Sequence, residues 1–327
     1  MADTTNLTGV TNVTAPQATK TRVRFGNIFT MSGPAFIIVA ALLWSLDAVI
    51  RADLRTIPPV FLVTLEHAFG LLFLLPWLLK LFQSWPKIST AAKVSLIVTS
   101  VISGVLGTAF YTAALGQVQF VPFSVVVLMQ QLQPIVVVLF SAILLREKIT
   151  ARFAVLAVFA LLGAYLINFP ELLPNLTTRP GQIQLLAAGL ALLAAIAWGT
   201  GTIFSKFALK EIDFKAATAG RFFITVIVGG VLSVLLQQVI PLNNISGTQL
   251  AQLLLIVLTS GMVALLIYYR GLKHTEAKVS TFAELVWPLS AFFIDIARGF
   301  AFTPSQLLGT VILLVCIVRI SRMNRER

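Results

Sequence analysis

Four titratable side chains stand inside long apolar stretches, where a charge is costly. Glu284 lies near the middle of its stretch, whereas Asp47, Glu66 and His67 lie toward one end of theirs. Ionisable groups in such segments usually face a partner or a water-filled cavity. Desolvation favours the protonated form of a carboxylate, and histidine titrates near neutral pH. These four residues are therefore candidates for carrying a coupling proton.

The same groups have two simpler explanations. Asp47 and Glu66 could cap helix ends or pair with one another near the membrane surface, which fits Glu284 less well. All of them could also merely bind substrate during facilitated diffusion. Proton coupling through Glu284, or through the Glu66-His67 pair, is the hypothesis that we carry forward.

Two prolines indicate where two of the apolar helices change direction. Proline removes the hydrogen bond to the carbonyl four residues earlier. For Pro134 and Pro288 those carbonyls belong to Gln130 and Glu284. We therefore expect a free carbonyl beside a polar side chain at both places, facing protein or water rather than lipid. A packed kink satisfied by a neighbouring hydroxyl is the alternative, but the matched positions favour a central cavity.

Both prolines belong to an internal repeat. Ala41-Leu42-Leu43-Trp44-Ser45 recurs 154 positions later as Ala195-Ile196-Ala197-Trp198-Gly199, and Gln133-Pro134 recurs at the same offset as Trp287-Pro288. Between them, Ser103-Gly104 and Tyr111 recur 157 positions later as Ser260-Gly261 and Tyr268. Matched landmarks at a nearly constant offset indicate two copies of one unit.

The elements that carry these residues are long apolar helices. The chain is 58% hydrophobic and 11% charged, with a mean hydropathy of +0.94, which no ordinary soluble domain shows. About 20 apolar residues span a bilayer as a helix. We expect spans near 33–52, 58–80, 94–115, 121–145, 151–169, 183–206, 214–238, 248–270, 277–297 and 304–320. The predicted fold is an all-α integral membrane protein of ten transmembrane helices.

Five helices in each copy make the repeat inverted, because the second copy must enter the membrane from the opposite side. We place the copies at 31–170 and 181–322, after a disordered cytoplasmic tail at 1–30. Inverted repeats of this kind build a midplane site with alternating access in many secondary transporters.

The net charge of +12 does not indicate a nucleic-acid partner. Of the 24 Lys and Arg, 19 fall in six segments on one side of the predicted spans, and Arg51, Arg55, Arg179 and Arg298 fall on the other. This bias follows the positive-inside rule, so both termini are predicted to be cytoplasmic in a multi-pass protein of the cell membrane. The basic residues are expected to contact anionic membrane lipid.

The predicted cavity wall combines polar and aromatic groups. Arg221 is suited to hold a carboxylate, because its guanidinium matches that geometry. For the aromatic residues, ordinary helix packing is an equally good explanation. The substrate-binding candidates are Trp44, Tyr111, Gln130, Gln133, Trp198, Arg221, Tyr268, Glu284 and Trp287. No metal or cofactor motif and no clustered catalytic set occurs, so we predict neither a cofactor, a metal site nor an enzyme.

These motifs, in this order, resemble the EamA-type branch of the drug/metabolite transporter superfamily over residues 33 to 322. The resemblance rests on the Trp44 and Trp198 motifs, on Gly220-Arg221-Phe222, and on Gln133-Pro134 followed by Leu145-Arg146-Glu147-Lys148-Ile149-Thr150 and Gly163. The chain departs from the family pattern at Arg146, where glycine is usual, at Ala301, where Glu147 would recur, and at Glu66-His67, where many relatives have arginine.

The resemblance implies a secondary active transporter that exports small metabolites, such as amino acids or related organic solutes. It implies a central cavity lined by the first, third, fourth, sixth, eighth and ninth helices. A membrane scaffold or receptor that transports nothing is the alternative prediction. Such a protein would not need paired polar kinks at equivalent positions.

Overall fold

The computed structural model describes residues 32–51, 54–117, 129–130, 132–168, 182–297 and 303–323, and these residues form helices and turns without a strand. The predicted tail at 1–30 lies outside them. The first repeat contains α1 (Gly33–Trp44), α2 (Asp47–Arg51), α3 (Pro59–Ser84), the short 3₁₀ turn η2 (Trp85–Lys87), α4 (Thr90–Val98), the π-helical η3 (Thr99–Gly107), α5 (Thr108–Gly116), α7 (Gln133–Leu144) and α8 (Ala151–Asn168).

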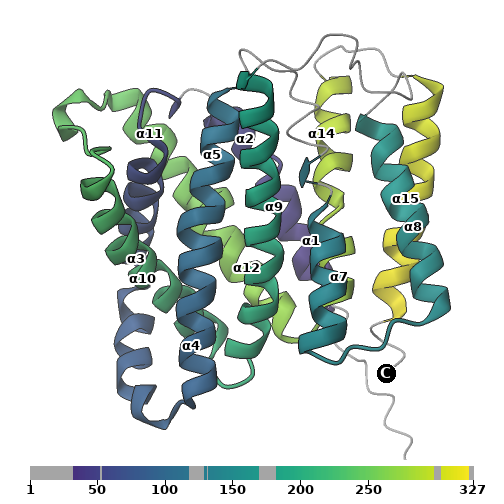
Figure 1. Ribbon diagram of the computed structural model, residues 1–327, viewed down its shortest axis with the longest axis horizontal. Coiled ribbons are helices and arrows are strands. Elements are labelled where there is room, and N and C mark those ends of the chain that lie inside the picture. Colours follow the sequence, from purple (N-terminus) through teal and green to yellow (C-terminus); the bar gives the residue numbers. More distant parts are fainter. Residues whose placement is uncertain are drawn as a thin grey trace, which may run out of the picture. The chain divides into compact units, whose positions relative to one another are not determined.

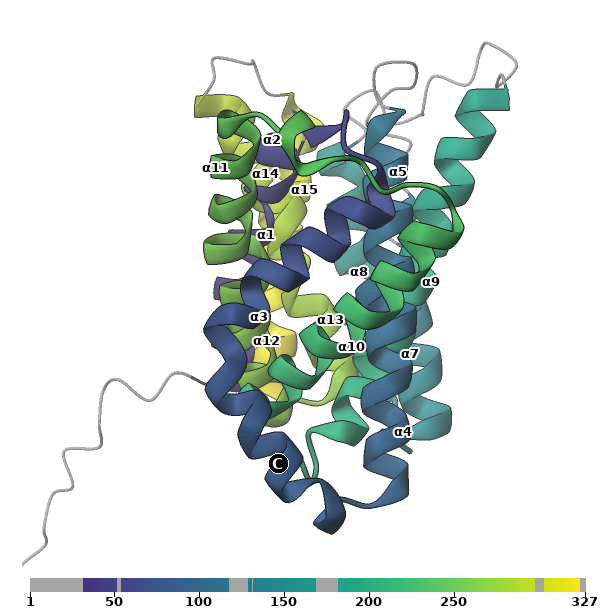
Figure 2. The ribbon, with the colours of Figure 1, turned by 90° about the vertical axis from the view of Figure 1, so that its left-hand side faces the viewer.

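The second repeat has the same order of spans, but its first span is the single continuous helix α9 (Gln182–Ala208). This repeat also contains α10 (Phe214–Leu235), the 3₁₀ turn η4 (Leu242–Asn244), α11 (Gly247–Ile256), the π-helical η5 (Val257–Gly261), α12 (Met262–Lys273), α13 (Ala277–Ala283), α14 (Val286–Ala297) and α15 (Pro304–Met323). All of these elements belong to one compact unit, Ser32–Arg327 (Figures 1 and 2).

Among the residues that the structure describes, six helical stretches are long and apolar enough to cross a membrane. They are Pro59–Lys87, Thr90–Gly116, Leu185–Ala208, Phe214–Leu235, Gly247–Lys273 and Pro304–Met323. Shorter apolar helices cover Gly33–Trp44, Gln133–Leu144 and Ala151–Ile167. Leucines and valines on their outer faces are exposed, as a lipid-facing surface requires. The prediction of an all-helical membrane protein is confirmed.

The first and ninth predicted spans are not continuous helices. The first is interrupted by a turn at Ser45-Leu46, which separates α1 from α2, and the Ser45 hydroxyl donates to the Leu42 carbonyl at 2.6 Å. The ninth is interrupted at Glu284-Leu285, between α13 and α14. Our prediction of an unbroken first helix was therefore wrong, because an apolar run carries no signal for this turn.

Both repeats have a π-helical segment in the middle of their third span. η3 carries Ser103-Gly104 and η5 carries the equivalent Ser260-Gly261. π-helical turns inside α-helices occur frequently at functional sites, because they redirect side chains and leave backbone groups unpaired. Two such turns at repeat-equivalent positions indicate that this distortion belongs to the architecture.

Helices of the two repeats pack in a pairwise pattern that reflects their equivalence. α3 packs on its counterpart α10 at one edge of the bundle, and α8 packs on its counterpart α15 at the other (Figure 1). Between these edges α1 packs on α12, and α9 packs on η3 and α5. The contact of α1 with α12 and the contact of α9 with α5 are equivalent, because each joins the first span of one repeat to the third span of the other. Both repeats therefore border the centre of the bundle.

A close approach of backbones holds α9 against η3. A Cβ atom placed on Gly201 would lie 2.2 Å from the Ser103 Cβ, so only glycine fits there. The Thr99 hydroxyl donates to the Gly201 carbonyl at 3.0 Å across the same contact. Small residues at helix crossings allow this packing in membranes.

Candidate functional site

A cavity of about 220 Å³ lies between the repeats, and it is lined by both. All nine predicted substrate-binding residues line its wall: Trp44, Tyr111, Gln130, Gln133, Trp198, Arg221, Tyr268, Glu284 and Trp287. The four predicted proton carriers line it as well: Asp47, Glu66, His67 and Glu284. The structure thus gathers these side chains in one place, and their roles remain predictions.

Glu284 stands at the break between α13 and α14 and is held by neutral donors. The Gln133 Nε2 donates to its Oε2 at 2.9 Å, and the Tyr268 hydroxyl lies 2.9 Å from its Oε1. The Tyr268 hydroxyl is also 3.1 Å from the hydroxyl of Thr202 on α9. Groups from both repeats therefore fix the position of this carboxylate, and the pairing of Gln133 with Glu284 joins the two kinked spans.

One expectation about the kinks was wrong. We expected Pro288 to leave the Glu284 carbonyl free, but the Trp287 N–H donates to it at 2.9 Å in a tight turn. In the first repeat the side chain of Gln130 is tied to the scaffold, because its Nε2 donates to the Ala191 carbonyl of α9 at 2.8 Å. The polar side chains, more than the backbone carbonyls, make these kinks polar.

Two aromatic pairs form repeat-related parts of the wall. Trp44 on α1 packs against Tyr268 on α12, with ring centroids 5.1 Å apart and an interplanar angle of 54°. Trp198 on α9 packs against Tyr111 on α5 at 5.1 Å and 53°. Each pair joins the tryptophan of one repeat to the tyrosine of the other. The cavity therefore has two similar aromatic faces.

Arg221 on α10 is buried, with 8% of its surface exposed, and its partners are hydroxyl groups. Its Nη1 donates to the Tyr269 hydroxyl at 3.1 Å, and its Nη2 donates to Ser103 Oγ at 3.0 Å. Its Nε has no hydrogen-bond partner in the structure. No carboxylate lies within ion-pair distance of it among the described residues. The guanidinium therefore places an unpaired positive charge beside the cavity.

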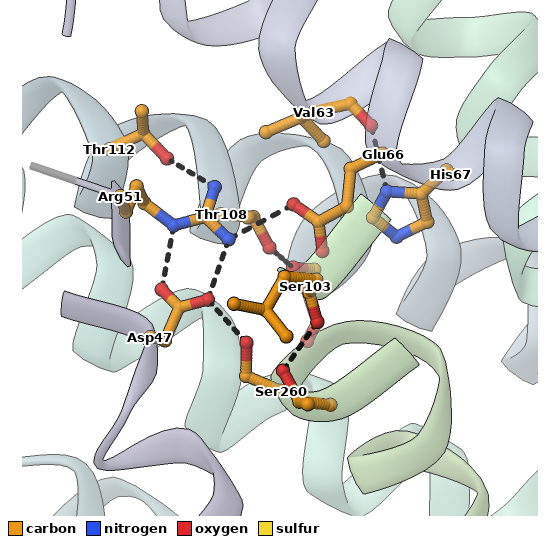
Figure 3. A network of polar contacts seen from close by, with 11 residues as sticks. Asp47, Arg51, Val63, Glu66, His67, Ser103, Thr108, Thr112 and Ser260 are labelled. Carbon is orange, nitrogen blue, oxygen red and sulfur yellow. Dashed lines mark hydrogen bonds and ion pairs between the residues drawn. The ribbon is translucent and has the colours of Figure 1, made fainter. Parts of the chain in front are cut away.

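A buried ion-pair cluster occupies another part of the wall (Figure 3). Arg51 Nε and Nη2 donate to the two carboxylate oxygens of Asp47 at 2.6 and 3.0 Å. Arg51 Nη2 also donates to Glu66 Oε2 at 3.0 Å, and Nη1 is 3.5 Å from Thr112 Oγ1. Ser260 Oγ donates to Asp47 Oδ1 at 2.8 Å, which connects α2 to η5 of the second repeat.

Arg51 is the functional candidate that the sequence analysis missed. We assigned it to an outer segment as a topology signal, but it is only 5% exposed and bonds to two carboxylates. A signal was present, because Asp47 and Arg51 are four residues apart and face the same side of a helix. Glu66 was expected to pair with Asp47 or cap a helix end, and Arg51 now supplies its partner.

His67 does not join this cluster. Its Nδ1 lies 2.8 Å from the Val63 carbonyl, which makes this nitrogen the donor, and its ring packs on Phe222 with centroids 4.4 Å apart. It is 4% exposed. These contacts are those of a neutral imidazole. Glu66 and His67 therefore do not act as one hydrogen-bonded unit.

The ion-pair cluster has no counterpart in the second repeat. At the offset of 154 positions, Asp47 corresponds to Gly201, Arg51 to Ser205 and Glu66 to Gly220. Ser205 bonds to hydroxyls, at 2.8 Å from both Thr99 and Tyr269. The first repeat therefore carries charged side chains at positions where the second repeat has small residues.

Polar contacts join the repeats at the end of the bundle where α7 ends and α13 begins. The Glu147 carboxylate accepts the N–H groups of Ala277 and Lys278 at 2.7 and 3.1 Å. The Lys278 ammonium donates to the Lys148 carbonyl at 2.6 Å. On the same side, Lys206 at the end of α9 donates to the Leu272 carbonyl at the end of α12, at 2.6 Å. These contacts hold that end of the bundle together.

The described residues contain no group of three or more His, Cys, Asp or Glu side chains able to hold a metal ion. The cavity wall offers hydrogen-bond donors and acceptors together with aromatic rings. Carboxylate, guanidinium, amide and hydroxyl groups all reach the same space.

Comparison with known proteins agrees with this architecture. The chain is 29% identical over 316 residues to the riboflavin transporter ImpX of Fusobacterium nucleatum subsp. nucleatum, covering 90% of this chain and 99% of that protein. A crystal structure of a protein with 16% identity matches the fold with a TM-score of 0.66, covering 90% of this chain and 98% of that one. The family model of EamA-like transporters matches twice, at residues 31–169 and 185–322, once for each repeat. The chain therefore belongs to the EamA-like transporter family.

Proposed function

We propose that this membrane transporter carries small organic solutes with a flat aromatic ring through its central cavity. The main support for the proposal is the presence of two similar Trp–Tyr pairs on the cavity wall. Trp44 with Tyr268, and Trp198 with Tyr111, present similar faces from the two repeats. Aromatic rings bind one another in offset or tilted geometry, which favours a flat ligand over a branched aliphatic one.

Riboflavin is the first solute to test. A relative of nearly the same length is named as a riboflavin transporter. The flavin ring is flat and carries an edge of carbonyl and N–H groups. The Gln133 amide and Glu284 carboxylate lie together at the cavity wall and offer both donors and acceptors to such an edge. Flavin recognition by this chain is thus supported by the relative and by the chemistry of the wall.

The identity of the solute and the direction of its transport are further parts of the proposal. The family resemblance favours export of amino acids or related solutes. Aromatic amino acids share the flat ring of a flavin and add a carboxylate, which the unpaired Arg221 guanidinium is suited to bind. Riboflavin and tryptophan therefore differ in whether they need Arg221.

We propose alternating access as the mechanism. The Glu147 and Lys206 contacts join elements at one end of the bundle, and they must break if the cavity opens at that end. Ten spans, with that end and both termini in the cytoplasm of a cell-membrane protein, complete the proposed arrangement. The distribution of basic residues supports it.

The test is transport by the purified full-length chain in liposomes. Intrinsic fluorescence reports riboflavin, and labelled tryptophan and a non-aromatic amino acid serve as comparison solutes. We expect riboflavin flux above empty liposomes, and lower affinity in Trp44→Ala and Trp198→Ala. Trp77→Phe is the matched control, because Trp77 lies outside the cavity and its ring contacts Lys215.

Two outcomes would contradict the proposal. Equal flux of the non-aromatic amino acid, unchanged in the two alanine variants, would exclude aromatic recognition. Absence of flux for every solute, in either direction, would favour the alternative of a scaffold or receptor.

A further inference from the structure

Glu284 differs from the other two carboxylates of the cavity in the kind of group that holds it. Asp47 and Glu66 both bond to the Arg51 guanidinium, which carries a permanent positive charge and can only donate hydrogen bonds. Glu284 has no ion-pair partner among the described residues, and its two oxygens accept from one amide and one phenol at 2.9 Å each. Neutral groups alone therefore hold Glu284.

This difference decides which carboxylate can change its charge. Protonating Asp47 or Glu66 takes away a negative charge that offsets a buried guanidinium, and a buried charge without its partner is strongly unfavourable. Protonating Glu284 breaks no ion pair. The other charges of the cavity wall, with His67 neutral, are two carboxylates and two guanidinium groups. The cavity is therefore without net charge when Glu284 carries a proton.

The phenol that bonds to Glu284 continues into a row of hydroxyl groups. Tyr268 Oη lies 2.9 Å from Glu284 Oε1 and 3.1 Å from Thr202 Oγ1. Thr202 Oγ1 in turn lies 3.1 Å from the carbonyl oxygen of Trp198, one turn earlier in α9. A hydroxyl group both donates and accepts, and its hydrogen rotates to suit its partners. The row can therefore carry its hydrogen bonds in either direction.

Both protonation states of Glu284 are satisfied by this row without movement of any atom except hydrogen. When Glu284 is charged, Tyr268 donates to Oε1 and Thr202 donates to Tyr268. When Oε1 is protonated it donates to Tyr268, Tyr268 donates to Thr202, and the Thr202 hydrogen turns to the Trp198 carbonyl. Ser280, another hydroxyl neighbour of Tyr268, can turn its hydrogen in the same way between a backbone carbonyl and the phenol. The guanidinium beside the other two carboxylates has no such freedom, because it cannot accept.

We infer that Glu284, rather than the Glu66-His67 pair, binds the coupling proton of this transporter, an inference that rests on the proposed transport function. The proton comes from water on the side to which the cavity is open and leaves to water on the other side. The equivalent position in the first repeat carries Gln130, which does not titrate and whose Nε2 donates to the Ala191 carbonyl. The two equivalent positions thus supply one proton site, and one proton is expected to move in each transport cycle.

The surroundings of Glu284 contain no charged group in direct contact with it among the described side chains. Its titratable or charged neighbours on the cavity wall are Asp47, Arg51, Glu66, His67, Tyr111, Arg221 and Tyr268. Of these, Tyr268 bonds to it. The elements packed on α13 and α14 are α1, α7, α8, α9 and α15. The charged or titratable residues of these packed elements and of α13 do not line the cavity, and they are Arg152, Tyr165, Lys206, Lys278, Cys316, Arg319 and Arg322. α14 itself carries Asp295, near the end of the helix that is farther from Glu284 along the chain.

The first experiment measures riboflavin transport by the full-length chain in liposomes, with and without an imposed pH gradient. Accumulation under the gradient is divided by the exchange of labelled for unlabelled riboflavin without a gradient, so that weaker substrate binding is not mistaken for lost coupling. In Glu284→Gln we expect this ratio to fall to the value seen without a gradient, whereas Glu284→Asp should retain part of it. Glu66→Gln is the matched control, because it removes a cavity carboxylate that is ion-paired, and its ratio should equal that of the parent.

The second experiment observes the proton directly and needs no substrate. A protonated carboxylic acid and a carboxylate absorb infrared light at different frequencies. Difference spectra of the purified chain between mildly acidic and mildly alkaline pH should therefore contain a carboxylic-acid band that is lost on the alkaline side. We expect this band to be absent in Glu284→Gln and present in Glu66→Gln. Tyr268→Phe removes the hydroxyl that bonds to Oε1, so it should change the frequency of the band.

The outcomes separate the two proposals. If the parent moves no riboflavin but the infrared band depends on Glu284 and on pH, the substrate proposal fails and the proton site stands. If Glu284→Gln keeps the gradient ratio of the parent, or if its infrared difference spectrum equals that of the parent, Glu284 is not the coupling site. Loss of the gradient ratio in Glu66→Gln alone would assign the proton to the cluster around Arg51 instead.

Discussion

Trp44 packs against Tyr268 across the boundary between the repeats, with ring centroids 5.1 Å apart. The equivalent pair, Trp198 with Tyr111, has the same separation, and its interplanar angle differs by one degree. Under the proposed alternating-access mechanism, such matched pairs would offer the substrate a similar aromatic contact in both states. The two-fold relation of the chain is therefore preserved at the cavity wall.

We predict that Trp44→Ala and Trp198→Ala lower substrate affinity by similar amounts. An aromatic pair contributes about 0.5–1.5 kcal/mol beyond its buried area, which corresponds to roughly 2- to 10-fold in affinity. Titration of the quenching of riboflavin fluorescence by purified protein measures this directly. A change in one variant but not in the other would show that the two aromatic faces are not equivalent.

The glycine contact between α9 and η3 gives a prediction about stability. Gly201→Ala forces a methyl group against Ser103, and overpacking of this kind costs about 1–3 kcal/mol. The same change at Gly189 in the same helix meets no atom within 4 Å and should be neutral, or stabilising by up to about 1 kcal/mol. Thermal unfolding in detergent compares the two, and equal melting temperatures would show that the contact is not tight.

The repeat explains why the cavity could be predicted in part. The offset between Trp44 and Trp198, and between Gln130 and Glu284, marked positions that the two-fold relation brings to the centre. The internal repeat identifies such positions because both copies face the same cavity. It does not report the turn at Ser45-Leu46, since a break in an apolar run has no compositional signature.

The cluster around Arg51 was beyond the sequence analysis for a related reason. Arg51 was placed outside the membrane because it stands at the end of the first apolar run, and its partner Glu66 is in another helix. Its repeat-equivalent, Ser205, carries no charge, so comparison of the two copies gave no indication of a charged site. Comparison of the two repeats cannot reveal a feature that occurs in only one of them.

We predict that the two ends of the bundle can be distinguished by labelling. Lys87 at the end of η2 and Asn244 at the end of η4 are both exposed, and the predicted topology places them on opposite sides of the membrane. Cysteines introduced singly at these positions, in a Cys316→Ser background, are treated in intact cells with a membrane-impermeant thiol reagent. Position 244 should react and position 87 should not, and reaction of both from outside would reject the topology.

The contact of Ser89 with Glu211 predicts a dependence of stability on pH. Glu211 accepts hydrogen bonds from Ser89 Oγ and N–H at 2.6 and 2.8 Å, and these bonds lower its pKa below the ordinary value of 4.5. Because the folded pKa is depressed, the stabilisation is present above the unfolded pKa and is lost as the pH falls through the folded pKa. Glu211→Gln should therefore melt below the parent at neutral pH, and this difference should shrink in acid. A difference that is constant across this range would contradict the interpretation.

The last prediction concerns the charge balance of the cluster around Arg51. Removing one member of a buried ion pair leaves an uncompensated charge and costs about 3–5 kcal/mol, whereas replacing all members with neutral groups is often tolerated. Arg51→Gln leaves the carboxylates of Asp47 and Glu66 facing each other without their counter-ion, and it should destabilise the protein strongly. The triple variant Asp47→Asn, Arg51→Gln, Glu66→Gln removes every charge of the cluster while keeping similar volumes. It should recover most of the lost stability in thermal unfolding. If the triple variant is as unstable as Arg51→Gln, packing rather than charge balance explains the cluster.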